Sequence, residues 1–118
     1  MENLEKRLIN NLNDKNIYLL YQVYKYINYV CDYGHIAIFS SILDIDLNEV
    51  KLGLKIINDT IITKLLEEAI MINNEQNSNE IIYYSNMISD YEAINNKIYS
   101  QKNDILNKII GFLEDNII

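Results

Sequence analysis

The chain lacks several of the residues on which many small folds depend. It has no proline, no tryptophan, three glycines and one cysteine, Cys31, among its 118 residues. The absence of proline and the small number of glycines favour long, uninterrupted helices. A single cysteine excludes an internal disulfide and a cysteine-based metal site, and it fits a reduced, intracellular setting.

Long apolar runs are also missing. No stretch approaches ~18 consecutive apolar residues, so we expect no transmembrane helix and no membrane partner. The opening Met-Glu-Asn-Leu-Glu-Lys-Arg has no apolar segment behind it, which predicts that there is no signal peptide. These features predict a cytoplasmic protein.

Positive charge is scarce. The sequence has 10 Lys and Arg residues against 17 Asp and Glu, a net charge of −7. This balance argues against a nucleic-acid partner, because phosphate contacts need local Lys or Arg, although the placement of the cations matters more than their sum. Ile, Asn and Tyr, which have AT-rich codons, are abundant, and this bias indicates an AT-rich genome.

The spacing of apolar residues predicts one mostly helical domain, residues 1–118. Apolar residues three and four positions apart predict helices over residues 2–13, 17–32, 35–43 and 47–58. The domain divides into an N-terminal helix within residues 1–16, a core over 17–85 and a C-terminal helix over 86–118.

A pair of strands is predicted between the core helices and the last helix. Residues 61–72 fit either a helix or a strand, the polar stretch 73–79 fits a loop, and the run Ile81-Ile82-Tyr83-Tyr84 is prone to form a strand. Strand, polar loop and strand would together make a hairpin.

The C-terminal helix carries more apolar surface than a small domain is expected to cover. A helix of about 30 residues is ~45 Å long, so part of its apolar stripe needs another partner. A second copy of the chain is the simplest one, and we predict a homodimer. The predicted dimerisation residues are Tyr91, Ile94, Ile98, Ile105, Ile109 and Phe112.

The segment YGHIAIFSSILDIDLNEVKLGLKIINDTII, residues 33–62, resembles the winged helix-turn-helix family. Ser40 occupies the small position where the two helices of that motif cross. The buried face of the second helix and the two wing strands are matched by Val50, Leu54 and Ile57, by Ile61-Ile62 and by Ile82-Tyr83-Tyr84-Ser85.

The resemblance implies an α+β, mostly helical fold: a winged helix-turn-helix with an N-terminal helix and a long C-terminal dimerisation helix. The alternative is an all-α helical bundle. Two residues depart from the family pattern. Asp44 stands where glycine is frequent in the turn, and the predicted wing tip has Glu75 but no Lys or Arg, which puts contact between the wing and DNA in doubt.

The resemblance also implies that the helix of residues 47–58 enters the major groove of double-stranded DNA, as recognition helices do. Asp46 is predicted to cap this helix with Glu49 as the partner of a capping box. The predicted DNA-binding residues are Asn48, Lys51, Leu52, Lys55 and Lys64.

Two functions fit these observations. The first is a dimeric, sequence-specific double-stranded DNA-binding protein, acting as a transcriptional regulator or as a plasmid or phage partition or replication accessory. The second is an acidic helical protein-interaction module, or a DNA mimic, that binds a nucleic-acid-handling protein. Carboxylates in rows on one helix face would favour the second, and the sequence spreads its acidic residues fairly evenly.

Nothing in the sequence predicts an enzyme. His35, the only histidine, begins a helix and is interpreted as a capping or surface residue, and Cys31 as an inert thiol. The sequence has no glycine-rich phosphate loop and no metal-ligand spacing. We therefore predict no catalytic residues, no metal and no cofactor.

Overall fold

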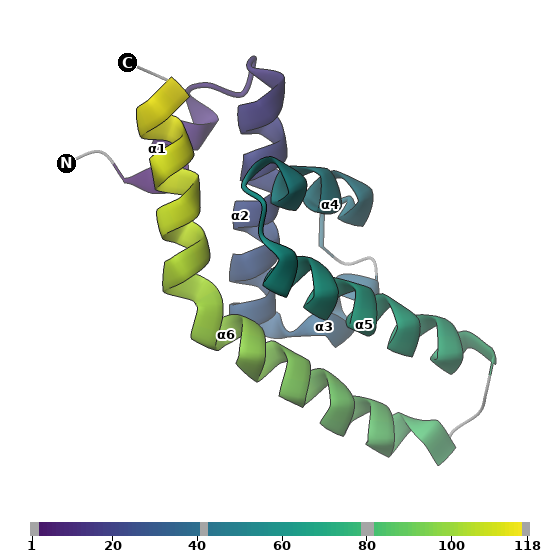
Figure 1. Cartoon of the computed structure of the whole chain (residues 1–118). Helices are drawn as coiled ribbons and strands as arrows, with labels where there is room; N and C mark the ends of the chain where they lie inside the picture. The colour runs from purple at the N-terminus through teal and green to yellow at the C-terminus, as the bar shows by residue number, and fades with distance from the viewer. Residues whose placement is uncertain (1–2, 41–42, 79–81, 117–118) are drawn as a thin grey trace.

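The computed structural model describes the backbone of residues 3–40, 43–78 and 82–116, and the side chains of these ranges except 75–89. These ranges contain six helices and no strand (Figure 1). The helices are α1 (Leu4–Ile9), α2 (Lys15–Tyr33), α3 (His35–Phe39), α4 (Leu47–Ile56), α5 (Thr60–Ser78) and α6 (Ile82–Asn116).

Short polar side chains fix where the first helices begin. The side chain of Asn3 accepts a hydrogen bond from the amide of Lys6 at 2.8 Å, and Asp14 caps α2 in the same way. The predicted cap at Asp46 is confirmed, because its Oδ1 accepts from the amides of residues 48 and 49 at 2.9 and 3.3 Å. Each cap satisfies a backbone donor that the helix leaves free.

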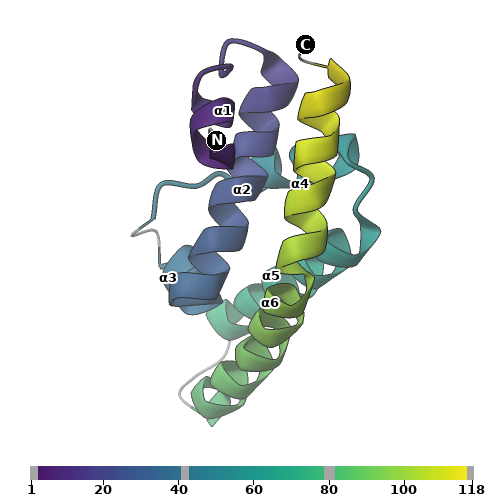
Figure 2. The same cartoon turned by 90° about the vertical axis from the view of Figure 1, so that its left-hand side faces the viewer.

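The bundle is organised around α2, which packs against α1, α3, α4 and α6. α5 and the first part of α6 lie side by side as a helical hairpin that projects from the bundle, and α6 then bends to run along α2 (Figures 1 and 2). This hairpin makes the molecule elongated, with principal extents of 53 × 25 × 23 Å.

A glycine sets the closeness of the crossing between α2 and α4. A Cβ placed on Gly53 would lie 2.4 Å from the carbonyl oxygen of Leu19 and 2.6 Å from a methyl carbon of Val23. Real side chains do not approach this closely, so the two backbones meet only because residue 53 has no side chain. Val50 and Leu54, on either side of this contact, are fully buried.

The winged α+β fold predicted from the sequence is wrong, and the alternative, an all-α helical bundle, is correct. Residues 61–72, the predicted first wing strand, lie inside α5, and Ile82-Tyr83-Tyr84 begins α6; Ile81 and the end of the predicted loop, residue 79, lie outside the described residues. The physical reason is tertiary packing. One face of α5 is buried at positions three, four and seven residues apart, and this burial outweighs the strand preference of β-branched residues. The face comprises Ile62, Leu65, Leu66 and Ala69.

The predicted helix-turn-helix crossing is also absent from the part of the chain that the structure describes. α3 packs against α2 and α6, whereas α4 packs against α2 and α5. Ser40, the predicted small residue at the crossing, is exposed, and its hydroxyl donates to the carbonyl of Ala37 at 2.6 Å. The close crossing lies at Gly53 instead.

Within the described ranges, no helix is both long enough and apolar enough to cross a lipid bilayer.

Candidate functional site

The predicted DNA-binding residues lie on the outer sides of α4 and α5. Asn48, Leu52, Lys55 and Lys64 are exposed, and Lys51 is half-buried. Leu52 leaves 52% of its surface accessible. α4 holds its residues in this orientation because the opposite face of the helix is locked against α2 at Gly53.

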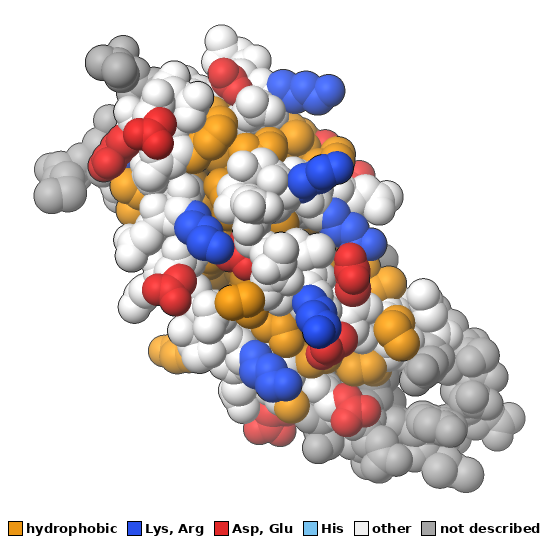
Figure 3. All heavy atoms as spheres, viewed as in Figure 1, with side chains coloured by type: hydrophobic (Ala, Val, Ile, Leu, Met, Phe, Trp, Pro, Cys, Tyr) orange, Lys and Arg blue, Asp and Glu red, His pale blue; other side chains and the backbone are white. Residues whose placement is uncertain are grey.

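The structure brings the three predicted lysines together. Lys51 and Lys55 of α4 and Lys64 of α5 line one open groove of about 500 Å³ between the two helices. We call this the lysine groove. Its other lining residues are Leu54, Asn58, Asp59, Thr60, Thr63 and Glu67, so Asn48 and Leu52 lie outside it. In Figure 3, positively charged side chains lie over α4, α5 and α6, with carboxylates between them.

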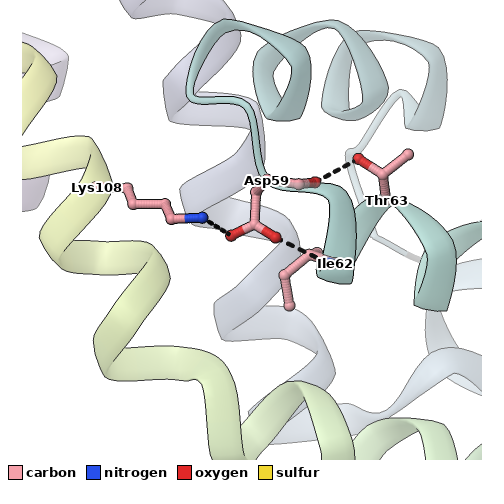
Figure 4. Close-up of polar contacts among 4 residues, drawn as sticks. All are labelled: Asp59, Ile62, Thr63 and Lys108. Atoms are coloured by element: carbon pink, nitrogen blue, oxygen red, sulfur yellow. Dashed lines mark hydrogen bonds and ion pairs between the residues drawn. The ribbon is translucent and has the colours of Figure 1, made fainter.

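A tight turn between α4 and α5 forms one end of the groove. Asn58 takes the left-handed conformation with φ 54° that asparagine tolerates better than most residues. Asp59 then begins α5. Its Oδ1 accepts from the amide of Ile62 at 2.9 Å, and its carbonyl accepts from the hydroxyl of Thr63 at 2.7 Å (Figure 4).

The carboxylate of Asp59 does not cancel the charge of the lysines. Asp59 is 5% exposed, and its Oδ2 accepts from Nζ of Lys108 in α6 at 3.2 Å, an ion pair that neutralises it (Figure 4). Glu67 is the other carboxylate that lines the groove. Three lysines against one uncompensated carboxylate make the groove locally positive on a chain whose net charge is −7.

The first turn of α4 has the opposite charge. The hydroxyl of Tyr18 donates to Oε1 of Glu49 at 3.1 Å. This hydrogen bond raises the pKa of Tyr18, and so do the partial burial of the phenol and the negative charges of Glu49, Asp46 and Asp44. These three carboxylates therefore lie near the Tyr18 hydroxyl. Glu49, predicted to complete a capping box, thus binds the Tyr18 hydroxyl, and Asn48 lies among carboxylates. A recognition helix reads bases with its N-terminal residues, and this end of α4 repels DNA phosphates.

The predicted dimerisation stripe is covered within one chain. Tyr91, Ile94, Ile98, Ile105 and Ile109 are between 0 and 5% exposed, and Phe112 is half-buried. They belong to the common core, because α6 packs against both α5 and α2. The apolar surface that was expected to need a second copy therefore finds its partners inside the protomer.

Sequence reasoning missed the residues that position the groove. Gly53 is an unremarkable helix residue in the sequence, and the Asp59–Lys108 pair spans 49 positions, so no local pattern indicated either contact.

His35, interpreted from the sequence as a capping or surface residue, is 0% exposed. The one signal in the sequence was its position directly after Gly34, where the chain turns between two helices.

Among the residues that the structure describes, no three or more His, Cys, Asp or Glu side chains are grouped so that they could hold a metal ion. Burial raises the pKa of the Cys31 thiol, and the nearby charge of Lys102 opposes this shift only in part.

No family model matches the chain, and neither does any curated protein or solved structure with which it was compared.

Proposed function

We propose that this protein binds double-stranded DNA through phosphate contacts made by the lysine groove. One observation carries the proposal: Lys51, Lys55 and Lys64, from two different helices, converge on one groove of a chain that is otherwise acidic. Local Lys and Arg supply the electrostatic part of nucleic-acid binding whatever the net charge of the protein.

The surroundings of the groove favour backbone contact over base reading. The acidic first turn of α4 surrounds Asn48, so the end of the helix that would read bases is the end that phosphates avoid. Lys51 and Lys55 lie one helical turn further along and one turn apart, where they can contact phosphates.

The absence of aromatic side chains from the groove lining favours a duplex over a single strand. Proteins that bind single strands stack bases on aromatic rings, and the described lining residues of the groove include none. Contacts to the phosphates of a duplex require no such platform.

Fluorescence anisotropy with a short, labelled, AT-rich duplex tests the proposal. Three phosphate contacts predict that the logarithm of affinity falls with the logarithm of salt with a slope of about −2.7, so a fourfold rise in salt weakens binding about 40-fold. The double variant Lys51→Glu/Lys55→Glu should lose most of the affinity, and its slope should approach about −1.

A matched variant separates the groove from the overall charge. Lys6→Glu/Lys97→Glu changes the net charge by the same amount at exposed positions that do not line the groove. It should keep nearly all of the affinity and the slope. Equal losses in the two double variants, or unchanged binding in Lys51→Glu/Lys55→Glu, would rule the proposal out.

A second function, an acidic helical protein-interaction module, is favoured by the group of Asp44, Asp46 and Glu49 beside the exposed Leu52. It predicts no binding to DNA even at low salt and measurable binding to a lysine-rich peptide. Asp44→Asn/Glu49→Gln, which leaves the Asp46 cap in place, should weaken that peptide complex. If the variant binds the peptide as the parent does, this second function is excluded.

A further inference from the structure

We propose that the contact between the α2–α3 turn and α6 is an acid-sensitive joint, which is closed while His35 is neutral and opens when His35 takes up a second proton. The proposal is independent of the lysine groove. It rests on the placement of one buried histidine between three helices.

His35 lies at the centre of an aromatic cluster. Its ring stacks against Phe39 of α3, with centroids 6.1 Å apart, and against Tyr91 of α6 at 5.8 Å. Phe39 and Tyr91 also stack on each other at 5.8 Å. Gly34 allows α6 to approach, because a Cβ on this residue would lie 2.9 Å from Nδ2 of Asn95.

The hydrogen bonds of His35 define its protonation state. Nδ1 lies 2.5 Å from Oδ1 of Asn95, an oxygen that can only accept, so Nδ1 carries the proton. In the neutral ring Nε2 is therefore unprotonated and accepts from the hydroxyl of Tyr26, also at 2.5 Å. A second proton, on Nε2, removes this acceptor and places a positive charge in a site with no exposure to water.

Among the described side chains, none that contacts the protonated ring carries a charge of opposite sign to stabilise it. The titratable side chains that contact it are Tyr26 of α2 and Tyr91 of α6, and from α3 it contacts Phe39, which does not titrate. Burial raises the pKa of both tyrosines, that of Tyr91 to about 12, so both stay neutral in acid. Burial lowers the pKa of His35 to about 4, and the bond to Asn95 opposes this shift. None of the charged side chains that the structure describes contributes to it.

The direction of the pH effect follows from these values. In the open joint the ring has its ordinary pKa of 6.5, and in the closed joint about 4. Between these two values the open form binds a proton and the closed form does not, so acid favours opening. The ratio of closed to open molecules should fall on the order of 100-fold from pH 7 to pH 4, with little change above pH 7.

The opening should be local. Tyr91 and Asn95 of α6 contact His35 at the turn between α2 and α3. Their neighbours Asp90, Ile94 and Lys97 line a groove together with residues of α5, so this is the part of α6 beside α5. On the other side of α2, α4 is held by the backbone contact at Gly53 and by apolar side chains, none of which titrates. Acid should therefore free α3 and the adjoining part of α6 before it frees α4.

Amide hydrogen exchange on the full chain at pH 7 and pH 4, expressed as protection factors, tests this order. Protection should fall about 100-fold more in residues 35–39 and 90–98 than in residues 48–56. A parallel NMR titration should show the ring of His35 titrating well below its ordinary pKa. An equal loss of protection in all three segments, or an ordinary titration of His35, would overturn the proposal.

Two variants change the joint in opposite ways. In His35→Asn the side chain is neutral at every pH, so the selective acid loss should disappear. Asn95→Asp places a carboxylate beside Nδ1, which should pair with the protonated ring and keep the joint closed in acid. Asp59→Asn is the control, because it removes a buried carboxylate that does not contact His35 and should leave the selective loss intact.

If His35→Asn does not fold, the selective acid loss of protection in the parent and in Asn95→Asp still tests the proposal. Undiminished selective acid loss in Asn95→Asp would contradict the proposal.

Discussion

The two sides of α2 are held by different kinds of contact. On one side α4 packs directly on the backbone of α2 at Gly53, between the buried side chains of Val50 and Leu54. On the other side α6 also packs through the common apolar core, but where it meets α3 the contact includes a histidine whose two ring nitrogens are both hydrogen-bonded. The first contact is steric and apolar, and the second depends on protonation.

This difference separates a side of the fold that is held rigidly by packing from a side that responds to pH. The α4 side carries the lysine groove on its outer surface, and the position of α4 on α2 depends on close packing that neither pH nor salt changes directly. The α6 side keeps a titratable group in the interior, which stays neutral at pH 7 because burial lowers its pKa to about 4.

The largest expected effect comes from filling the steric contact. Gly53→Ala puts a Cβ 2.4 Å from a backbone oxygen, so α4 must move, and we expect the free energy of unfolding to fall by about 3 kcal/mol. Urea denaturation followed by circular dichroism measures this. Gly111→Ala in α6 is the control: nothing lies within 4 Å of its Cβ, so the substitution should stabilise the protein by about 0.5–1 kcal/mol. Two changes of the same sign would refute the steric account of the α2–α4 crossing.

A smaller effect is expected at the turn between α4 and α5, where Asp59 pairs with Lys108 of α6. Asp59→Ala removes both the cap of α5 and the ion pair with Lys108, and we expect a loss of about 2 kcal/mol. The pair adds only part of this loss because Lys108 is 43% exposed. Asp46→Ala removes a cap without an ion pair and should lose about 1 kcal/mol. Chemical denaturation of both variants compares them, and equal losses would mean that the pair with Lys108 adds nothing.

The smallest effect is expected inside the aromatic cluster and has the opposite sign. The hydroxyl of Tyr91 is buried and has no hydrogen-bond partner among the described residues, so Tyr91→Phe should stabilise the protein by about 1 kcal/mol. Tyr26→Phe is the matched change, and it should destabilise the protein by about 1 kcal/mol because its hydroxyl donates to His35. Thermal melts at pH 7 distinguish the two. A loss of stability in Tyr91→Phe would mean that this hydroxyl has a partner, such as a buried water molecule.

Local features of the fold were predictable from the sequence. The helix over residues 17–32 appears as Lys15–Tyr33, and the helix predicted over 47–58 begins after its Asp46 cap and ends at Ile56. These predictions succeeded because caps and helical spacing act within a few residues. The three lysines of the groove were also chosen from the sequence, although their convergence was not predicted.

Predictions that depended on distant contacts failed. Residues 61–72 have apolar residues at helical spacing, which favours a helix, and β-branched residues, which favour a strand. Packing against α6 and α4 stabilises the helix. The stripe of α6 was correctly recognised as apolar. The sequence could not show that α2 and α5 would cover it within one chain, because both contacts join segments far apart in sequence.

The sequence by itself determined where α3 and α4 begin and which helix faces are apolar, because backbone capping and helical periodicity are local. Only the tertiary structure decided that α4 packs on α2 at Gly53, that Asp59 is paired with Lys108 and that His35 is buried. Each of these depends on atoms that come within a few ångströms only when distant segments pack together.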